Sequence, residues 1–332
     1  YCTFKFVDWN SKHPNGLLTN SLGDVSELSN FYEYQLYCKS LNASIQKFTI
    51  DTAERLKNYT EDEIVKLILK KYPEIEDRVD SHRVISIDPK GSADFDDAMS
   101  LTGDGSQKIL SIYIANVPLW MEALNLWSSF SQRISTIYLP DRRRPMLPTR
   151  LSECLCSLKE GHMRFAFVCQ VSINGEEIED VKMINALIRV DKNYRYEEEE
   201  LLEDGYYQRI LGLVKMLSKK YKYGNTKVRH SHELVSYLMI LMNYYCAKKM
   251  IENKNGIYRS AVLGSAPSSN EGLPENIATF LTQWNSSSGQ YQSYSESLGH
   301  ELLNLENYIH ITSPIRRLVD LLNMIQLQCN LG

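Results

Sequence analysis

The pattern of hydrophobic and polar positions divides the chain into a strand-rich middle and a helical second half. Alternating or short apolar runs predict strands at residues 4–7, 84–87, 109–117, 165–173 and 183–190. The segment 109–117 is mostly apolar, which predicts a strand buried on both faces. The alternation in 4–7 is typical of an exposed edge strand.

Apolar residues at helical spacing predict the remaining elements. They predict helices over 26–36, 60–72, 205–221, 231–253 and 314–329. Thr60 and Glu63 have the spacing of a capping box at a helix start. Strands first and helices later predict an α+β architecture rather than a doubly wound α/β sheet. The acidic run 197–200 is interpreted as a solvated helix face.

Length and composition suggest an ordinary globular protein of two or more structural units. The chain has 332 residues, of which 43% are hydrophobic and 23% charged. No apolar run approaches the roughly 18 residues that span a bilayer, so no membrane association is expected. The chain begins Tyr1-Cys2-Thr3 without Met or a secretory signal, and we expect a piece excised from a longer protein.

Cysteine usage and net charge add two weaker constraints. Seven cysteines, an odd number without a CxxC pair, favour free thiols in a reducing cytoplasmic or nuclear compartment. The net charge of −4 argues mildly against a nucleic-acid partner. A local basic channel is nevertheless compatible with an acidic whole.

The densest chemistry lies just after the strand at 84–87. Asp88, Asp94, Asp96 and Asp97 place four carboxylates within ten residues, around a Gly-Ser-Ala turn. Carboxylates gathered in one pocket repel one another unless a cation neutralises them. Oxygen ligands alone select a hard ion, Mg²⁺ or Mn²⁺. Two such ions about 4 Å apart would activate a water and stabilise the leaving oxygen of a phosphodiester.

Two other interpretations compete with a catalytic metal site. An Asp-rich surface loop is common and needs no ion. An EF-hand fails because the D-x-D-x-D-G spacing and the glutamate at loop position 12 are missing.

Four blocks of the sequence resemble the ribonuclease II family, whose catalytic domain is called RNB. IDPKGSADFDDA at 87–98 resembles its signature loop, and YLPDRRRPMLP at 138–148 resembles a second motif. The segment 151–158 continues that motif. YIHITSPIRR at 308–317, with Asp320 at the expected offset, resembles a further block. The resemblance covers residues 87–320 in the family's order.

The resemblance implies roles for the acidic cluster and one arginine. Asp88, Asp94, Asp96 and Asp97 correspond to the magnesium ligands, and the catalytic residues would be Asp96, Asp97 and Arg316. Asp96 corresponds to the aspartate on which RNA cleavage in the family depends most. A guanidinium at Arg316 offers a planar fork to phosphate oxygens in the transition state. An arginine at a helix start also needs a compensating anion, which a phosphate would supply; the alternative is a helix-surface pair with Arg317.

Other positions are expected to contact RNA. Tyr196 matches the aromatic residue that stacks on the 3′-terminal base, although an ordinary core tyrosine is the alternative. Arg142 and Arg143 lie in a run of three arginines that would follow the RNA backbone, or form a solvated basic patch. Arg317 and Asn243 complete the predicted RNA-binding set.

The resemblance also implies domain boundaries and shows departures. Residues 1–50 would be the end of an OB-like cold-shock domain and a linker, and 51–332 an RNB domain cut short before the S1 domain. Asn116 stands where the family has aspartate, and Ser236 and Tyr237 stand where it has a glutamate pair. These changes leave the contact to the terminal ribose in doubt.

The expected function is 3′→5′ hydrolysis of single-stranded RNA to nucleoside 5′-monophosphates with Mg²⁺, for which Mn²⁺ may substitute. Processive and distributive action, and membership of a larger RNA-decay complex, both stay open. A second hypothesis is an RNB-like protein that binds RNA with weak or no cleavage, and a weaker third is a deoxyribonuclease.

Overall fold

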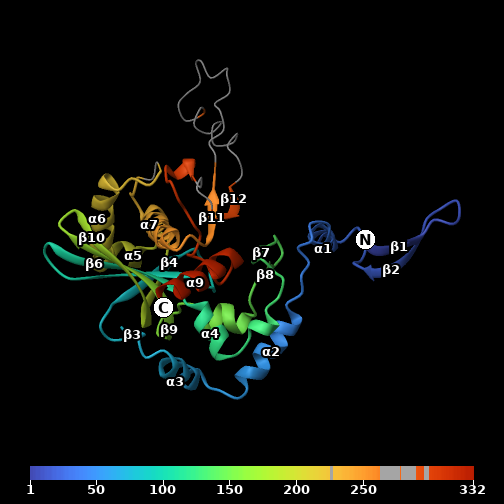
Figure 1. The fold of residues 1–332 in the computed structure, drawn as a ribbon, viewed down its shortest axis with the longest axis horizontal. Helices are drawn as coiled ribbons and strands as arrows, with labels where there is room; N and C mark the ends of the chain where they lie inside the picture. The colour runs from blue at the N-terminus through green and yellow to red at the C-terminus, as the bar shows by residue number, and fades with distance from the viewer. Residues whose placement is uncertain (225–226, 262–276, 278–288, 295–298) are drawn as a thin grey trace.

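The chain forms a main body from which an N-terminal arm projects (Figure 1). The computed structural model describes residues 1–224, 227–261, 277, 289–294 and 299–332. Within these residues no helix has both the length and the hydrophobicity to cross a membrane. All seven cysteines are free thiols, in agreement with the expectation from their odd number.

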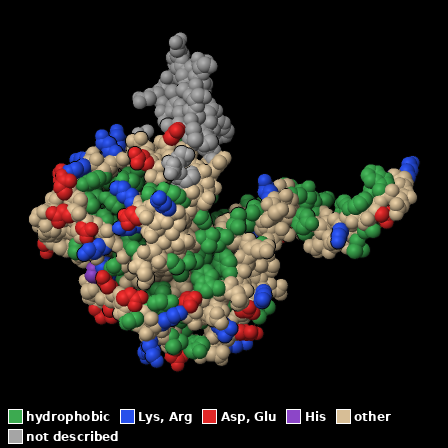
Figure 2. Space-filling view, viewed as in Figure 1, with side chains coloured by type: hydrophobic (Ala, Val, Ile, Leu, Met, Phe, Trp, Pro, Cys, Tyr) green, Lys and Arg blue, Asp and Glu red, His purple; other side chains and the backbone are tan. Residues whose placement is uncertain are grey.

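A β-hairpin forms the arm. Strands β1 (Cys2–Asp8) and β2 (Asn15–Ser21) pair antiparallel, which confirms the strand predicted at 4–7. Apolar side chains gather on this arm, as the green atoms of Figure 2 show. The side chains of Phe4, Phe6 and Trp9 are each more than half exposed. Helix α1 (Leu28–Cys38) connects the arm to the body.

A six-stranded mixed sheet organises the body, in the order β3-β10-β4-β5-β6-β9. Its strands are β3 (Glu76–Asp77), β4 (Val84–Asp88), β5 (Asp97–Thr102), β6 (Gln107–Ala115), β9 (Met163–Asn174) and β10 (Glu177–Arg195). The long strand β10 pairs antiparallel with β9 along its first part and parallel with β4 along its last part. Because β9 also pairs with β6, the sheet closes on itself.

Helices cover both faces of this sheet (Figure 1). One face packs against α6 (Gly205–Lys220) and α7 (Ser231–Glu252) through a core that includes Ile85, Met99 and Ile112. The other packs against α2 (Gln46–Leu56), α3 (Glu61–Lys71) and α4 (Val117–Ala123) through a core that includes Val84, Ala98 and Tyr113. Alternate residues of one strand enter opposite cores, so β6 is buried on both faces as predicted.

The remaining described elements are short or peripheral, apart from the last helix. They are β7 (Ile137–Tyr138), β8 (Arg143–Arg144), a π-helical turn (Arg150–Leu155), α5 (Glu199–Glu203), β11 (Ile257–Ser260), β12 (Gln290–Ser293) and α9 (Leu318–Leu331), with 3₁₀ turns at Trp127–Ser129 and Glu301–Leu303. A mixed sheet flanked by helices confirms the predicted α+β class. The capping box at Thr60 and Glu63 is also present, with both reciprocal hydrogen bonds formed.

The last helix begins four residues later than predicted. Residues before Leu318 pair instead with a neighbouring segment: Thr136 N donates to Arg316 O, and Leu318 N donates to Ile134 O. Arg317 is extended, with φ −134°. The prediction that 314–317 is helical was therefore wrong, because these backbone bonds and the side chain of Asp320 hold the segment outside the helix.

The acidic run 197–200 is a solvated helix face only in its second half. Glu199 and Glu200 are exposed in the first turn of α5, as predicted, whereas Glu197 and Glu198 precede the helix. Glu197 has a left-handed backbone, with φ +56°, and accepts hydrogen bonds from the backbone N–H and hydroxyl of Ser231. Glu198 accepts a hydrogen bond from the backbone N–H of Arg195. The two glutamates fix the turn into α5 and the start of α7.

The predicted domain boundary between residues 50 and 51 falls inside α2. Phe48 of this helix is buried in the second core, so α2 belongs with the main body. The assignment of residues before α2 to an OB-like domain stays a prediction.

Substitution of Trp120 tests how much a buried aromatic side chain contributes to the stability of the body. Its side chain is fully buried in α4, 5.6 Å from the ring of Phe165. We expect Trp120→Ala to lower the free energy of unfolding by about 3–5 kcal/mol because it leaves a cavity. Urea unfolding followed by circular dichroism would measure it. The control is Trp9→Ala on the arm, where a change above about 0.5 kcal/mol is not expected; equal losses would contradict this account.

Candidate active site

The four aspartates of segment 87–98 line one pocket. Strand β4 ends at Asp88 and β5 begins at Asp97, and the loop between them carries Asp94 and Asp96. The loop turns at Gly91, whose φ of +87° favours glycine. The pocket has a volume of about 550 Å³, and its wall is completed by Pro89, Lys90, Gly91, Ser92, Tyr138, Arg143 and Arg316. The structure thus brings together the predicted metal ligands and two of the predicted arginines.

A buried serine holds the loop from behind. The Ser157 hydroxyl donates to the carbonyl of Ala93 and accepts from the backbone N–H of Phe95, at 3.0 and 2.9 Å. The Ser157 carbonyl accepts a hydrogen bond from Nε of the buried Arg164. Sequence reasoning matched segment 151–158 to a motif but gave Ser157 no role, because a serine in a loop carries no signal of its distant partners.

The carboxylate of Asp96 is held by residues more than 200 positions away. Its Oδ1 accepts a hydrogen bond from the backbone N–H of Ile315 at 3.0 Å, and its Oδ2 from Nε of Arg316 at 3.1 Å. Asp96 is only 3% exposed. The anion that Arg316 was predicted to need is therefore present in the chain itself, and Arg316 lies before α9 rather than in its first turn.

A second arginine is bound to the acidic loop. Nη1 of Arg143 donates to Asp94 at 2.5 Å, and Nη2 donates to Glu153 of the π-helical turn. Sequence reasoning assigned Arg143 to the RNA backbone and did not select Glu153. In this conformation Arg143 contacts the acidic loop.

Burial makes the remaining negative charge costly. It raises the pKa of Asp96 to about 7, with Arg316 acting in the opposite direction. Burial also raises the pKa of Asp88 to about 7 and that of Asp97 to about 8. Repulsion from Asp96 and Asp94 adds to the rise at Asp88, and repulsion from Asp88 adds to the rise at Asp97. Several acids whose pKa values are raised together in one pocket are typical of a functional site.

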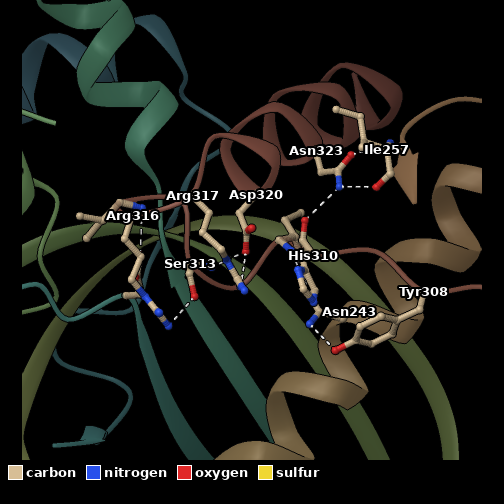
Figure 3. A network of polar contacts seen from close by, with 12 residues as sticks. Asn243, Ile257, Tyr308, His310, Ser313, Arg316, Arg317, Asp320 and Asn323 are labelled. Carbon is tan, nitrogen blue, oxygen red and sulfur yellow. Dashed lines mark hydrogen bonds and ion pairs between the residues drawn. The ribbon is translucent and has the colours of Figure 1, made fainter. Parts of the chain in front are cut away.

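A polar network supports Arg316 from the side of α9 (Figure 3). Nη2 of Arg316 donates to the Ser313 hydroxyl at 2.9 Å, and the backbone N–H of Ser313 donates to Asp320 at 2.8 Å. Asp320, which is fully buried, also accepts from Nη2 of Arg317 at 2.8 Å. Arg317, predicted to bind RNA, is thus engaged with Asp320. Ser313 was part of a matched motif but was not selected from the sequence.

Asn243, which was predicted to contact RNA, is buried and hydrogen-bonded within the protein. Its side chain is 2% exposed, in the middle of α7. Its amide nitrogen donates to the Tyr308 hydroxyl at 3.0 Å, and its oxygen accepts from the backbone N–H of Ile311, also at 3.0 Å. Figure 3 shows Asn243 beside Tyr308, below the network around Asp320. The residue supports the segment that carries Arg316.

The other predicted RNA contacts lie around the pocket. Tyr196 follows β10, and its backbone N–H donates to the carbonyl of Asp88 at 3.1 Å. One face of its ring stacks on His232, with centroids 3.8 Å apart. Arg142 is half-exposed and forms an ion pair with Glu33 of α1. Tyr138 at the pocket rim, 61% exposed, was not selected from the sequence as a site residue.

The family can now be assigned. The sequence profile of the RNB domain matches residues 77–219 and 209–332, well over half of the chain. This chain belongs to the RNB domain family.

Similar proteins and structures agree with this assignment. Ribonuclease R of Ureaplasma parvum is 27% identical over 205 residues, covering 61% of this chain and 27% of that protein. The structure of Mycoplasma genitalium RNase R in complex with ribose methylated single-stranded RNA gives a TM-score of 0.76 at 20% identity, over 98% of this chain and 60% of that chain. Yeast Ssd1, a pseudonuclease, gives 0.75 at 15% identity, over 99% of this chain and 49% of that chain.

The two structural likenesses show the RNB fold alone. The chain spans less than half the length of the curated relatives it matches. Both a ribonuclease and a pseudonuclease share this fold, so the residues of the pocket decide what it can do.

Two of the three departures from the RNB pattern lie in the protein interior, and the third, Ser236, is exposed on α7. Asn116, at the start of α4, is buried and donates to the side chain of Asn185 at 2.8 Å. Tyr237 is buried in α7, and its hydroxyl donates to the carbonyl of Tyr221. Neither residue lines the aspartate pocket.

A divalent cation fits the chemistry of this pocket. The donors are carboxylate oxygens, which suit a hard ion, and three of the four aspartates have pKa values raised by burial. Among the residues that the structure describes, however, no group of three or more Asp, Glu, His or Cys is arranged to hold a metal. Arg143 and Arg316 hold Asp94 and Asp96 instead. A cation coordinated by all four aspartates would therefore compete with these two arginines for the carboxylates of Asp94 and Asp96.

The raised pKa values predict how a cation changes stability with pH. Acidic groups whose pKa is raised on folding stabilise the protein fully below their unfolded pKa near 4, and this contribution is lost as the pH rises through about 7 to 8. We therefore expect Mg²⁺ to raise the melting temperature more at pH 8 than at pH 6, relative to EDTA.

Thermal unfolding at both pH values would measure this difference. In Asp88→Asn the extra Mg²⁺ effect at pH 8 should shrink, because one of the acids is gone. An equal shift at the two pH values would show that the cation acts elsewhere.

Proposed function

We propose that this chain carries the catalytic centre of a 3′→5′ exoribonuclease that hydrolyses single-stranded RNA to nucleoside 5′-monophosphates. One observation carries the proposal: four aspartates and Arg316, from segments more than 200 residues apart, line a single pocket. Support comes from relatives named Ribonuclease R and Exoribonuclease 2. A similar structure of Ribonuclease R holds single-stranded RNA.

Each pocket residue has a physical role in this proposal. Asp88, Asp94, Asp96 and Asp97 would hold two Mg²⁺ ions, or Mn²⁺ in their place. When bound, these ions supply an activated water and neutralise charge at the leaving 3′ oxygen. Arg316, held by Ser313, would donate to the phosphate oxygens as charge develops there.

RNA would be oriented by residues at the pocket edge. The face of Tyr196 not covered by His232 is the one that a terminal base would stack on. Arg142 and Arg143 would exchange their carboxylate partners, Glu33 and Asp94, for backbone phosphates. This exchange couples RNA entry to the release of Asp94 towards a metal ion.

A second candidate is an RNB protein that binds RNA without cutting it. Two observations favour it: arginines already hold two of the four aspartates, and a structurally similar protein is a pseudonuclease. Against it stands the complete set of aspartates, since a protein that only binds has little use for several buried acids. A deoxyribonuclease is a third candidate, which comparison of equal-length RNA and DNA substrates would test.

We further propose that the residues before α2 end an OB-like cold-shock domain and that the intact protein works in a reducing intracellular compartment, alone or in an RNA-decay complex. The exposed aromatic residues of the arm and the free thiols support the first two statements. Co-purification of the full-length protein would test the third.

Asp96→Asn tests the proposed centre. We expect it to lower RNA hydrolysis more than about 100-fold, because the neutral amide loses the charge that binds the cation. It should leave RNA affinity in EDTA nearly unchanged. The assay is a 5′-labelled single-stranded RNA in Mg²⁺, in Mn²⁺ and in EDTA, with products resolved on a gel.

Asp104→Asn is the matched control, since Asp104 is an exposed aspartate in the loop between β5 and β6, outside the aspartate pocket. Intact protein that binds the RNA but leaves it uncut in both metals would support the binding protein instead. Cleavage by Asp96→Asn at the normal rate would place the catalytic centre elsewhere.

Ser313→Ala tests the positioning of Arg316. Loss of the hydroxyl removes one hydrogen bond to a charged group, and we expect kcat for RNA cleavage to fall about tenfold with little change in KM. Because the effect passes through Arg316, Ser313→Ala should cause no further loss in an Arg316→Ala background. Additive losses in the double variant would show that Ser313 acts independently.

A further inference from the structure

A second pocket lies beside Arg164, a residue whose side chain donates a hydrogen bond to the carbonyl of Ser157. It has a volume of about 290 Å³ and is bordered by α2, α3, the π-helical turn and the start of β9. Its lining includes Leu56, Tyr59, Glu61, Ile64, Arg150, Cys154, Leu155, Lys159, His162 and Arg164. It shares no lining residue with the aspartate pocket.

Positive charge dominates this pocket. Arg150 and Lys159 form no ion pair with any residue that the structure describes. Arg164 is 1% exposed, and its Nη1 donates to Glu61 at 2.5 Å. His162 lies close to the same carboxylate. Glu61 thus balances one of the three permanent cations, and two remain for an anionic ligand.

The rest of the wall is apolar or aromatic. Leu56, Ile64 and Leu155 form an apolar surface, and the ring of Tyr59 is about half exposed above it. An aromatic ring beside aliphatic side chains suits the flat face of a nucleobase. The carboxylate of Glu61, 37% exposed, can accept hydrogen bonds from hydroxyl groups. Cations for a phosphate, an acceptor for a sugar and an apolar wall for a base therefore occur together.

We propose that this pocket binds a mononucleotide, with its phosphate on Arg150 and Lys159 and its base against Tyr59. The volume is near the lower limit for small-molecule sites, which favours one nucleotide over an RNA strand. The buried Arg164 gives the site a fixed wall. This inference does not depend on whether the chain cleaves RNA.

The position of the site connects it to the acidic loop. Arg164 donates through Nε to the carbonyl of Ser157, and the hydroxyl of Ser157 binds both Ala93 and Phe95. The proposed ligand, whose sugar would bond to Glu61, would therefore contact the partner of Arg164, which supports the aspartate loop. Occupancy of the second pocket has a direct physical route to the first.

Cys154 provides a native reporter for this pocket. It lines the pocket and is partly exposed, whereas Cys38 and Cys329 are exposed elsewhere. The rate of alkylation by iodoacetamide would be measured for each cysteine by mass spectrometry, in EDTA to suppress binding at the aspartates. AMP at ten times its Kd should slow alkylation of Cys154 about tenfold. Cys38 and Cys329 should react at unchanged rates.

Variants and ligand fragments identify which contacts matter. Arg150→Gln and Lys159→Gln should each weaken protection by AMP about tenfold, because each removes a charged hydrogen-bond donor. Lys66→Gln, an exposed lysine of α3 outside the pocket, is the matched control and should change nothing. Adenosine and inorganic phosphate, tested separately, should each protect less than AMP.

Three results would overturn the proposal. Absence of protection at millimolar AMP would show that the pocket does not bind nucleotides. Phosphate that protects as well as AMP would reduce the site to a simple anion site. Protection that persists unchanged in the Arg150→Gln, Lys159→Gln double variant would place the nucleotide elsewhere. A chain that fails to cleave RNA but shows the expected protection would refute the nuclease and retain this site.

Discussion

Four carboxylates can share a buried pocket only if the chain holds them against their own repulsion. Here the loop between β4 and β5 is fixed from two sides: the Ser157 hydroxyl binds its backbone, and Ile315 with Arg316 binds the carboxylate of Asp96. Both contacts link segments far apart in the sequence. The shape of the acidic loop therefore depends on tertiary contacts rather than on local sequence, and the rest of the pocket is arranged around this constraint.

Arginines in such a pocket can bind either the aspartates or a phosphate, and these two contacts compete. When they pair with Asp94 and Asp96 they reduce the repulsion between the carboxylates, and when they contact a phosphate they leave those carboxylates free for a cation. The two arginine charges stay in the pocket while their partners change, and each bound divalent cation adds two further positive charges. A nuclease and a protein that only binds RNA can share the same residues and differ in how easily this exchange occurs.

Local features of the sequence predicted much of this structure. The strand at 84–87, the doubly buried β6 and the capping box at Thr60 depend on neighbouring residues, and all three were found. The gathering of the aspartates also followed from their spacing. The errors arose where distant partners decide. Backbone hydrogen bonds from residues 134 and 136 hold Arg316 and Leu318 and delay the start of α9, while Tyr308 and Ile311 occupy the amide of Asn243. No pattern within a window of the sequence contains those contacts.

Strand β10 fixes the distance between Asp88 and Tyr196. Arg195 lies opposite Asp88 in the parallel pairing, and the next residue, Tyr196, binds the Asp88 backbone. The separation between Tyr196 and Asp88 is thus set by backbone register, which cannot change by less than a whole residue. Insertions or deletions in the turn between β9 and β10 would leave the distance between Tyr196 and Asp88 unchanged. An insertion near the end of β10 would displace Tyr196 from Asp88 altogether, so that short stretch has far less freedom to vary.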